Sequence, residues 1–233
     1  MKNKSITDKI QLAVLDMAGT TVADDGLVIS AFDAAATAVG IPEVGPQRDE
    51  ARRYVLDTMG QSKIIVFRAL LGSHAAALQA NTAFEDAYAR LIADGLATPI
   101  DGAAEAISKL RDHGIRVALT TGFSPRTQAA LIAALGWQSL ADLVLAPVDG
   151  MRGRPYPDMI LTALMRLQID GVHNVAVLGD TAVDVETARR AGAKIAAGTL
   201  TGAHDEAQLI AAGATDVVSS VVEFTDLLIA HNE

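Results

Sequence analysis

The pattern of hydrophobic and polar positions divides this chain into two kinds of segment. In residues 10–24, and again from residue 99 onward, short apolar runs alternate with segments whose apolar residues recur at helical spacing. Such runs are typical of buried strands, and such segments are typical of helices. The expected strands are 10–17, 116–121, 143–146, 174–180, 193–197 and 216–219, and the expected helices are 103–113, 125–135, 157–167, 183–191, 205–212 and 222–229. This alternation predicts an α/β fold, a doubly wound parallel sheet with helices on both faces.

A block without strand patterns interrupts the alternation. Only helical spacing is found there, at 28–39, 48–58, 63–71 and 75–94, with breaks at 40–42 and 71–73. We therefore expect residues 1–24 and 99–233 to form the α/β core domain. Residues 25–98 are expected to form a helical cap domain, inserted after the first strand and hinged near residues 24 and 98.

The composition narrows the class of partner. Of the 233 residues, 50% are hydrophobic but only 4% are aromatic, so the core is expected to be aliphatic. The net charge of −9 argues against nucleic acid as a partner, although a metal and local donors can still attract an anionic substrate. The absence of cysteine excludes disulfides and cysteine nucleophiles. Residues 1–9 lack the apolar core of a signal peptide, and no apolar run is long enough for a bilayer, so we expect a soluble cytoplasmic protein without a membrane partner.

Polar side chains stand where several expected strands end. Asp16 ends the first strand, Thr121 ends the second, and Asp180 ends a later one, with Asp184 shortly after it and Arg154 before an expected helix. Because the carboxyl ends of parallel strands share one edge of a sheet, these side chains can converge in one crevice. Each of these residues, taken by itself, can also have an ordinary structural role. Asp16 or Asp184 can be a turn or helix-capping residue, and Arg154 can be a solvated loop charge.

The order of these residues resembles the haloacid-dehalogenase-like superfamily of phosphotransfer enzymes. Asp16, Thr121, Arg154 and the pair Asp180 and Asp184 follow the order of the four motifs of that superfamily. The resemblance covers the whole chain and includes a helical cap after the first motif. It implies a Rossmann-like core and a hydrolase that forms an aspartyl-phosphate on Asp16, with Mg²⁺ offsetting the negative charge.

The resemblance also implies a role for each group around the phosphoryl site. Mg²⁺ is expected on Asp16, on Asp180 and on the backbone carbonyl of Ala18, with Asp184 binding it directly or through water. The phosphoryl group is expected to contact Thr121, Gly122, Arg154 and the backbone of Ala18, Gly19 and Thr20.

Ala18 departs from most phosphatases of this superfamily, which carry a second Asp there to protonate the leaving alcohol. Such proton transfer contributes about 10²–10⁴-fold, so its loss points to a leaving group that does not need it. Lys63 is the only lysine between residues 25 and 98. A lysine amine can form a Schiff base with an aldehyde and then act as the electron sink that breaking a P–C bond requires. The alternative is an ordinary solvated helix lysine.

Short motifs around these residues resemble the phosphonoacetaldehyde hydrolase family. They are Asp16-Met-Ala-Gly-Thr-Thr21, Met59-Gly60 with Lys63, Thr120-Thr-Gly122, Gly153-Arg-Pro-Tyr-Pro157 and Gly179-Asp-Thr181 with Asp184. The resemblance implies that Lys63 forms the Schiff base, that Met59 lines the pocket and that the protein is a homodimer through its cap. Two positions differ from that family, with Val66 in place of a His and Phe123 in place of a Tyr.

Three functions stay open from the sequence alone. The leading expectation is a Mg²⁺-dependent hydrolase that cleaves the C–P bond of phosphonoacetaldehyde or a close relative and releases phosphate. A phosphomonoesterase of the phosphoglycolate phosphatase type is the first alternative, and a non-catalytic protein that binds a phosphate ligand is the second. For the C–P reaction the pKa of Lys63 has to fall, and Ile64, Ile65 and Phe67 are expected to desolvate its amine.

Overall fold

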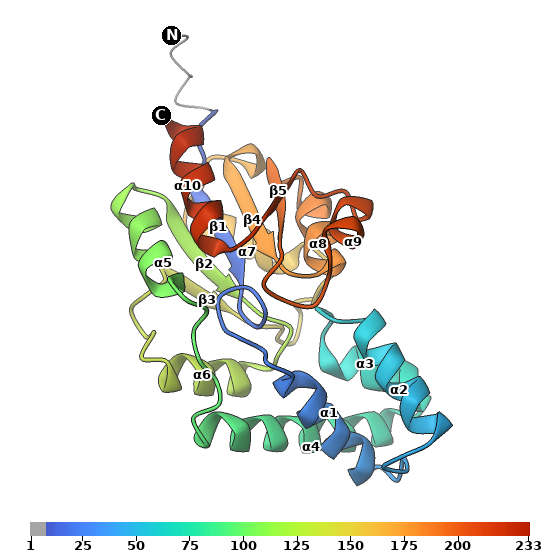
Figure 1. Ribbon diagram of the computed structural model, residues 1–233. Helices are drawn as coiled ribbons and strands as arrows, with labels where there is room; N and C mark the ends of the chain where they lie inside the picture. The colour runs from blue at the N-terminus through green and yellow to red at the C-terminus, as the bar shows by residue number, and fades with distance from the viewer. Residues whose placement is uncertain (1–7) are drawn as a thin grey trace.

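A six-stranded parallel sheet forms the centre of the computed structural model, which describes residues 8–233. The strand order is β3-β2-β1-β4-β5-β6 (Figure 1). β1 pairs with β2 from Leu12 opposite Arg116 to Asp16 opposite Thr120, and with β4 on its other side, so its carboxyl end lies in the middle of the sheet edge. The strands are β1 (Leu12–Asp16), β2 (Arg116–Thr120), β3 (Leu143–Leu145), β4 (Val175–Gly179), β5 (Ile195–Thr199) and β6 (Asp216–Val218).

Helices cover both faces of this sheet. One buried cluster joins a face of the sheet to α5, α6 and α10, and a second cluster joins the other face to α7, α8 and α9. β1 contributes to both because Ala13 and Leu15 belong to the first cluster and Leu12 and Val14 to the second. The predicted doubly wound α/β fold is therefore confirmed. These helices are α5 (Ala103–Asp112), α6 (Pro125–Ala134), α7 (Asp158–Arg166), α8 (Ala182–Ala191), α9 (Glu206–Ala211) and α10 (Val221–Asn232), with a 3₁₀ helix at Val172–Asn174.

Five helices separate β1 from β2, and the first four of them lie beyond the carboxyl ends of the strands (Figure 1). α4 packs against α1, α3 and α6, which joins the inserted helices to the sheet layer. The buried Arg48 of α2 donates to the Asp33 and Thr37 side chains of α1, at 3.2 and 2.7 Å, and so ties α1 to α2. The inserted helices are α1 (Leu27–Ala38), α2 (Pro46–Asp57), α3 (Lys63–Leu71) and α4 (His74–Ala93).

The aliphatic core that the composition predicts is found on one face of the sheet but not among the inserted helices. The described residues of the cluster under α7, α8 and α9 include no buried aromatic side chain. By contrast, a series of ring contacts with centroid separations of 4.6–6.2 Å runs through Phe32, Phe67, Phe84, Tyr88 and Phe123. Because Phe123 belongs to the loop between β2 and α6, this aromatic cluster packs α1, α3 and α4 onto the sheet layer.

Many element boundaries differ by one to three residues from those expected, and two of these differences have a clear cause. β5 begins at Ile195 rather than at residue 193, because the Ala193 N–H still donates to the Ala188 carbonyl, at 3.1 Å, and closes the end of α8. α10 continues to Asn232 rather than ending at residue 229. Its last turn is held because the Asn232 side chain accepts from the Ile10 N–H and donates to the Ile10 carbonyl, at 2.8 and 2.9 Å. Among residues 8–233, no helix has both the length and the apolar character that crossing a membrane requires.

Candidate active site

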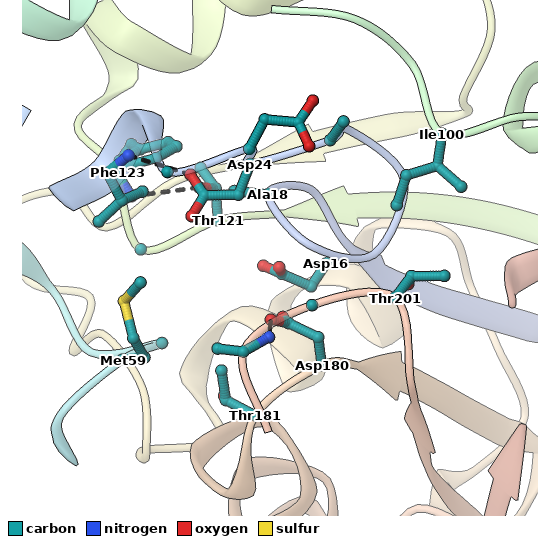
Figure 2. A pocket seen from close by; sticks show the side chains of 18 of the residues that line it. Asp16, Ala18, Asp24, Met59, Ile100, Thr121, Phe123, Asp180, Thr181 and Thr201 are labelled. Atoms are coloured by element: carbon teal, nitrogen blue, oxygen red, sulfur yellow. Dashed lines mark hydrogen bonds between the residues drawn. The ribbon is translucent and has the colours of Figure 1, made fainter. Parts of the chain in front are cut away.

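Four of the predicted side chains line one cavity at the carboxyl edge of the sheet. Asp16 ends β1, Thr121 follows β2, Asp180 follows β4, and Arg154 lies in the loop before α7. The cavity has a volume of about 670 Å³ and extends from the sheet edge to the inserted helices (Figure 2). The parallel strands thus bring together side chains that are far apart in the sequence, as their strand-end positions predict.

Arg154 is buried, with 3% of its surface exposed, and it binds two carboxylates. Its Nη2 donates to Asp16 and its Nη1 donates to Asp184. Asp184 is also part of a capping box at the start of α8, where its Oδ2 accepts from the Thr181 N–H at 3.2 Å. Arg154 is therefore not a solvated loop charge. Asp184 both caps α8 and belongs to the charged cluster.

The Asp180 carboxylate is fixed by the turn after β1 and by the loop after β5. Its Oδ2 accepts from the Ala203 N–H at 2.8 Å, and its Oδ1 lies 3.4 Å from the hydroxyl of Thr20. Gly19 has a positive φ of 84°, and a Cβ at this position would collide with the Asp180 carboxylate. Glycine therefore allows the turn to pass this close to Asp180.

The turn after β1 offers fewer backbone donors than the resemblance implies. Gly19 and Thr20 use their N–H groups inside the turn, at 2.7 and 3.1 Å, so these two amides are not free for a phosphoryl group. By contrast, none of the hydrogen bonds within residues 8–233 involves the N–H or the C=O of Ala18, which lines the cavity. Ala18 is therefore a position at which this turn presents unpaired backbone groups to a ligand.

Three carboxylates and one guanidinium form this cluster. One oxygen each of Asp16, Asp180 and Asp184 lies within 4.8 Å of the others. Burial raises the pKa of Asp16 to about 7, with Arg154 opposing the rise and Asp184 adding to it. Burial and the charges of Asp16 and Asp184 also raise the pKa of Asp180. The excess negative charge and the carboxylate oxygens suit a divalent cation such as Mg²⁺.

Lys63 begins α3 and lines the same cavity as Asp16. Its Nζ lies 5.9 Å from the ring centroid of Phe84 and 5.8 Å from that of Phe123. Burial lowers the pKa of Lys63 to about 8, although the carboxylate of Asp24 opposes the fall. The amine therefore lies beside aromatic rings from α4 and from the loop after β2. In this environment a smaller fraction of the Lys63 amine is protonated than in water.

The two isoleucines that follow Lys63 in the sequence do not provide this environment. Ile65 is 39% exposed, Phe67 stacks on an aromatic ring of α1, and neither of these nor Ile64 lines the cavity. The expectation is wrong for Ile64 and Ile65, because successive residues of a helix point in different directions. Phe67 lies one turn along α3, on the same face as Lys63, and contacts the Phe84 ring with centroids 6.2 Å apart, so it belongs to the aromatic surroundings of the amine. Val66, at the position of the family His, is buried in the core cluster and does not line the cavity either.

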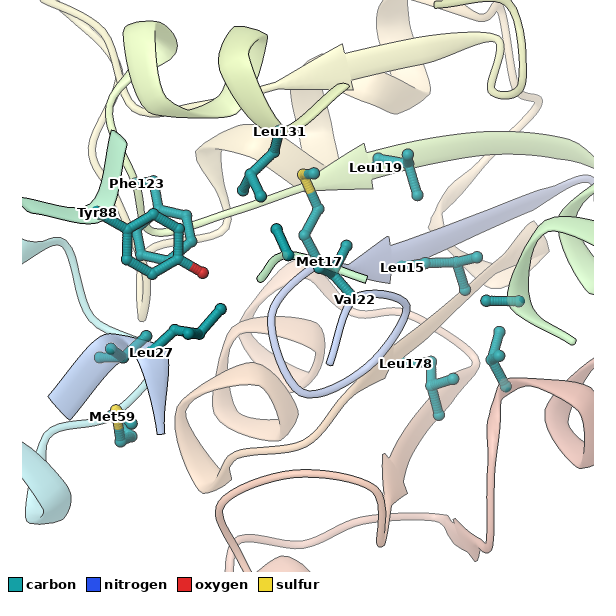
Figure 3. Packing of buried hydrophobic residues seen from close by; sticks show 14 of the residues in the cluster. Leu15, Met17, Val22, Leu27, Met59, Tyr88, Leu119, Phe123, Leu131 and Leu178 are labelled. Atoms are coloured by element: carbon teal, nitrogen blue, oxygen red, sulfur yellow. The ribbon is translucent and has the colours of Figure 1, made fainter. Parts of the chain in front are cut away.

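Residues 59–62, which precede α3, pack directly on the loops that carry the site. A Cβ on Gly122 would lie only 2.9 Å from the Gln61 carbonyl oxygen, and a Cβ on Gly153 would lie 3.2 Å from the Cβ of Ser62. Met59 is 7% exposed and lines the cavity at its inserted-helix side (Figures 2 and 3). The close approach of backbone to backbone at Gly122 therefore sets how deeply this loop can dock.

Three parts of the cavity wall lie outside the motifs. Asp24 lines the cavity between β1 and α1, and residues 98–101 line it between α4 and α5. A polar residue shortly after the first motif is the signal that could have identified Asp24. The loop after β5, which contributes residues 201–203, carries no such signal. It reaches the site only because β5 lies beside β4 in the sheet.

Comparisons with known proteins agree with this geometry. A family model described as haloacid dehalogenase-like hydrolase matches residues 10–192. A phosphonoacetaldehyde hydrolase of Bacillus cereus strain B4264 is 35% identical over 97 residues, which is 41% of this chain and 37% of that protein. The aligned segment thus spans well under half of that relative. The phosphonoacetaldehyde hydrolase of strain AH820 is 29% identical over 200 residues, which is 79% of this chain and 74% of that protein.

Solved structures share the fold across nearly the whole chain. A phosphonoacetaldehyde hydrolase-like protein from Oleispira antarctica gives a TM-score of 0.82 at 24% identity, covering 100% of this chain and 96% of that one. CbbY from Rhodobacter sphaeroides, in complex with phosphate, gives a TM-score of 0.73 at 21% identity, covering 92% and 96%. At these identities the likeness shows the fold alone. Because the family match covers residues 10–192, and thus most of the chain, this protein belongs to the haloacid dehalogenase-like hydrolases.

Proposed function

We propose that this hydrolase uses Mg²⁺ and Asp16 to cleave the C–P bond of phosphonoacetaldehyde or a close relative, releasing phosphate. The observation that carries the proposal is that Lys63 lines the cavity of Asp16 with its pKa lowered to about 8. At pH 7 about a tenth of such amines are neutral, against fewer than about one in a thousand for exposed lysines. The phosphonoacetaldehyde hydrolases among the relatives add support.

The buried carboxylates would assemble the phosphoryl site. Mg²⁺ held by Asp16, Asp180, Asp184 and the Ala18 carbonyl would offset the negative charge that the phosphoryl group meets there. Arg154 orients Asp16 through Nη2, and its guanidinium would also donate to phosphoryl oxygens. The Thr121 hydroxyl accepts from the Phe123 N–H at 3.2 Å, which leaves its own proton available for a phosphoryl oxygen.

Lys63 would supply the electron sink. Its neutral amine attacks the aldehyde carbon, and loss of water leaves an iminium. Asp16 then takes the phosphoryl group, and the electron pair of the P–C bond moves toward the nitrogen to give an enamine. Protonation of the enamine carbon and hydrolysis release the aldehyde, while water hydrolyses the aspartyl-phosphate. Because the leaving group is carbon and not an alkoxide, the reaction does not need the acid that Ala18 replaces.

We further propose that residues 1–24 and 99–233 act as a core domain and residues 25–98 as a cap that brings Lys63 to it. The two hinges run side by side, with the Ala23 N–H donating to the Thr98 carbonyl at 2.9 Å and the Ile100 N–H donating to the Thr21 carbonyl at 3.0 Å. The close packing of residues 59–62 on Gly122 supports docking of the cap over Asp16. Docking would exclude water until the aspartyl-phosphate forms.

The proposal predicts a covalent adduct on Lys63. Incubation with phosphonoacetaldehyde or acetaldehyde and borohydride should reduce an imine on this residue, which peptide mass mapping would locate. Lys63→Arg should lose both the adduct and phosphate release, because a guanidinium does not form the imine. Lys109→Arg is the matched control, since Lys109 lies on α5 with its side chain 51% exposed. A wild-type protein without an adduct on Lys63 would contradict the proposal.

A phosphomonoesterase is the second candidate. It is favoured by the two positions where this chain lacks the proton-bearing side chains of the phosphonoacetaldehyde hydrolase family, because Val66 is buried away from the cavity and Phe123 has no hydroxyl. A panel of phosphate esters separates the two candidates. Full hydrolysis of an ester by the Lys63→Arg variant, without phosphate release from phosphonoacetaldehyde by the wild type, would assign the protein to the esterases.

A further inference from the structure

Asp24 is a carboxylate of the cavity wall to which the proposed reaction gives no role. It lies at the first hinge, between the turn after β1 and the start of α1 (Figure 2). Its Oδ1 accepts from the Val28 N–H at 3.0 Å, and its carbonyl accepts from the Leu27 N–H at 2.6 Å, so the start of α1 fixes its position. Within residues 8–233, the other oxygen, Oδ2, makes no hydrogen bond or ion pair, which leaves it available to exchange a proton.

Asp24 and Lys63 interact across this cavity. Of the charged groups that act on the Lys63 amine, Asp24 has the largest effect, ahead of Arg154, Asp16 and Asp180. Both residues line the cavity, and each charge acts on the pKa of the other group. A carbonyl group bound in the cavity therefore has both the amine and the carboxyl in the wall around it.

The other titratable groups near Asp24 are less suited to exchange protons with a ligand. Asp25, beside it, also lines the cavity but is exposed to solvent. Tyr88 of α4 lies in the field of Asp24, but it is fully buried and does not line the cavity. Burial raises the pKa of Asp24, against the opposing Val28 N–H, and so brings the carboxyl closer to the pKa of the amine.

We propose that Asp24 transfers the proton in Schiff-base formation at Lys63, an inference that rests on the imine step of the proposed function. Asp24 takes a proton from the Lys63 ammonium, which leaves a neutral amine and a protonated carboxyl. The amine attacks the carbonyl carbon, and the proton that the nitrogen then loses moves to the carbonyl oxygen to give a carbinolamine. Asp24 protonates that hydroxyl, and the C–O bond breaks with its electron pair leaving in water. The products are an iminium, one water molecule and the regenerated carboxylate.

This assignment explains how the imine can form although the side chains of Ala18 and Val66 cannot exchange a proton. The carboxyl that most phosphatases of the superfamily carry at position 18 would instead come from the hinge, where it faces the amine rather than a leaving alcohol. Because Asp24 also accepts from the N–H groups of Leu27 and Val28 in the first turn of α1, the proton donor and the cap would be positioned by the same few residues.

The test compares two reactions of Lys63 in the full-length protein, both located by peptide mass mapping. Acetylation by acetic anhydride needs only a neutral amine, whereas imine formation with acetaldehyde, trapped by saturating cyanoborohydride, also needs proton transfer. Asp24→Asn keeps an oxygen acceptor for the Val28 N–H but cannot transfer the proton. We expect acetylation at pH 7 to be as fast as in the wild type or faster, because the ammonium loses a stabilising anion. Imine formation should slow by at least about tenfold.

Asp25→Asn is the matched control, because Asp25 has a positive φ of 40° that asparagine also adopts readily. It should leave both rates unchanged. Imine formation at the wild-type rate in Asp24→Asn would overturn the proposal, and so would equal slowing of both reactions, which would mean that Asp24 only shapes the start of α1. If imine formation depends on Asp24 but phosphonoacetaldehyde yields no phosphate, the assignment of Asp24 stands and the proposed C–P cleavage fails.

Discussion

Arg154 positions two of the three buried carboxylates in the site. Its Nη2 and Nη1 bind Asp16 and Asp184, while its Nε is buried without a partner among residues 8–233. Buried ion pairs are costly to break singly, because the remaining charge is then left without compensation. The orientation of Asp16 is thus linked to that of Asp184, and through the capping box to the start of α8.

Asp16→Asn should reduce turnover by roughly 10⁴-fold or more, because an amide cannot become an aspartyl-phosphate. The fold should persist, since the side chain is nearly isosteric and its oxygen can still accept from Arg154. In metal-free buffer at pH 7.5 the midpoint of thermal unfolding, Tm, should not fall, because burial disfavours the charge that the substitution removes and Asp184 still pairs with the Arg154 guanidinium. Phosphate release and thermal denaturation measure the two effects. Substantial turnover in a preparation shown by mass spectrometry to be free of deamidation would remove Asp16 from the role of nucleophile.

The residues of the charged cluster could be predicted from the sequence because Asp16 and Asp180 stand at strand ends and because all four, with Arg154 and Asp184, follow a motif order. The surroundings of Lys63 could not be predicted in this way. Phe84 lies on α4, which packs on α3, and Phe123 lies in a loop after β2, so the first reaches the amine through the packing of two inserted helices and the second through their packing on the sheet layer. Spacing along the chain contains no information about either kind of packing, which is why the expected contacts with Ile64 and Ile65 are wrong.

At the scale of elements, the loop at residues 59–62 connects the inserted helices to the site. It packs at Gly122 after β2 and at Gly153 before α7, while the residue that follows it, Lys63, begins α3. The order of helices and strands could be predicted, because each apolar run or helical stretch is continuous in the sequence. The docking of this loop could not, since it depends on two glycines whose neighbours come from another part of the chain.

Gly122→Ala should weaken this docking without unfolding the protein. The new Cβ would lie 2.9 Å from the Gln61 carbonyl oxygen and 3.0 Å from that of Gly60, and both are backbone atoms that can move only with the loop. A displacement of this kind should lower kcat/KM by roughly 10–100-fold, because Lys63 would be misplaced relative to Asp16. Steady-state kinetics and the rate of imine trapping on Lys63 measure the effect.

Gly153→Ala is a milder substitution against the same loop and can be compared with Gly122→Ala. Its Cβ would meet the side chain of Ser62 at 3.2 Å, a looser contact than the backbone contact at Gly122, so a smaller loss is expected. Far-ultraviolet circular dichroism would establish that both variants are folded. Wild-type kcat/KM in Gly122→Ala would show that docking of residues 59–62 is not needed for the reaction.

At the scale of the whole molecule, the buried carboxylates make folding depend on pH and on metal. Asp16 and Asp180 have raised pKa values in the folded protein, so between about pH 4 and pH 7 the folded state binds more protons than the unfolded state. Stability contributed by protonation of these groups is present at low pH and is lost as pH rises through their folded pKa values. Lys63 affects stability over a different pH range, between its lowered pKa of about 8 and its ordinary pKa. Its titration therefore does not mask this effect.

Metal-free protein should therefore be less stable at pH 7.5 than at pH 5.5, by about 1–3 kcal/mol, which corresponds to several degrees in Tm for a chain of this size. Mg²⁺ should raise Tm at pH 7.5, because it binds the ionised cluster in the folded state alone, and should raise it less at pH 5.5, where protons compete for the same oxygens. Thermal denaturation in chelator and in excess Mg²⁺ at both pH values tests this expectation. Asp16→Asn should show a smaller pH dependence and a smaller response to Mg²⁺ than the wild type, since it lacks one of the titrating ligands. A Tm of the metal-free wild type that rises from pH 5.5 to 7.5, or that Mg²⁺ leaves unchanged at pH 7.5, would contradict the assignment of Asp16, Asp180 and Asp184 as a cation site.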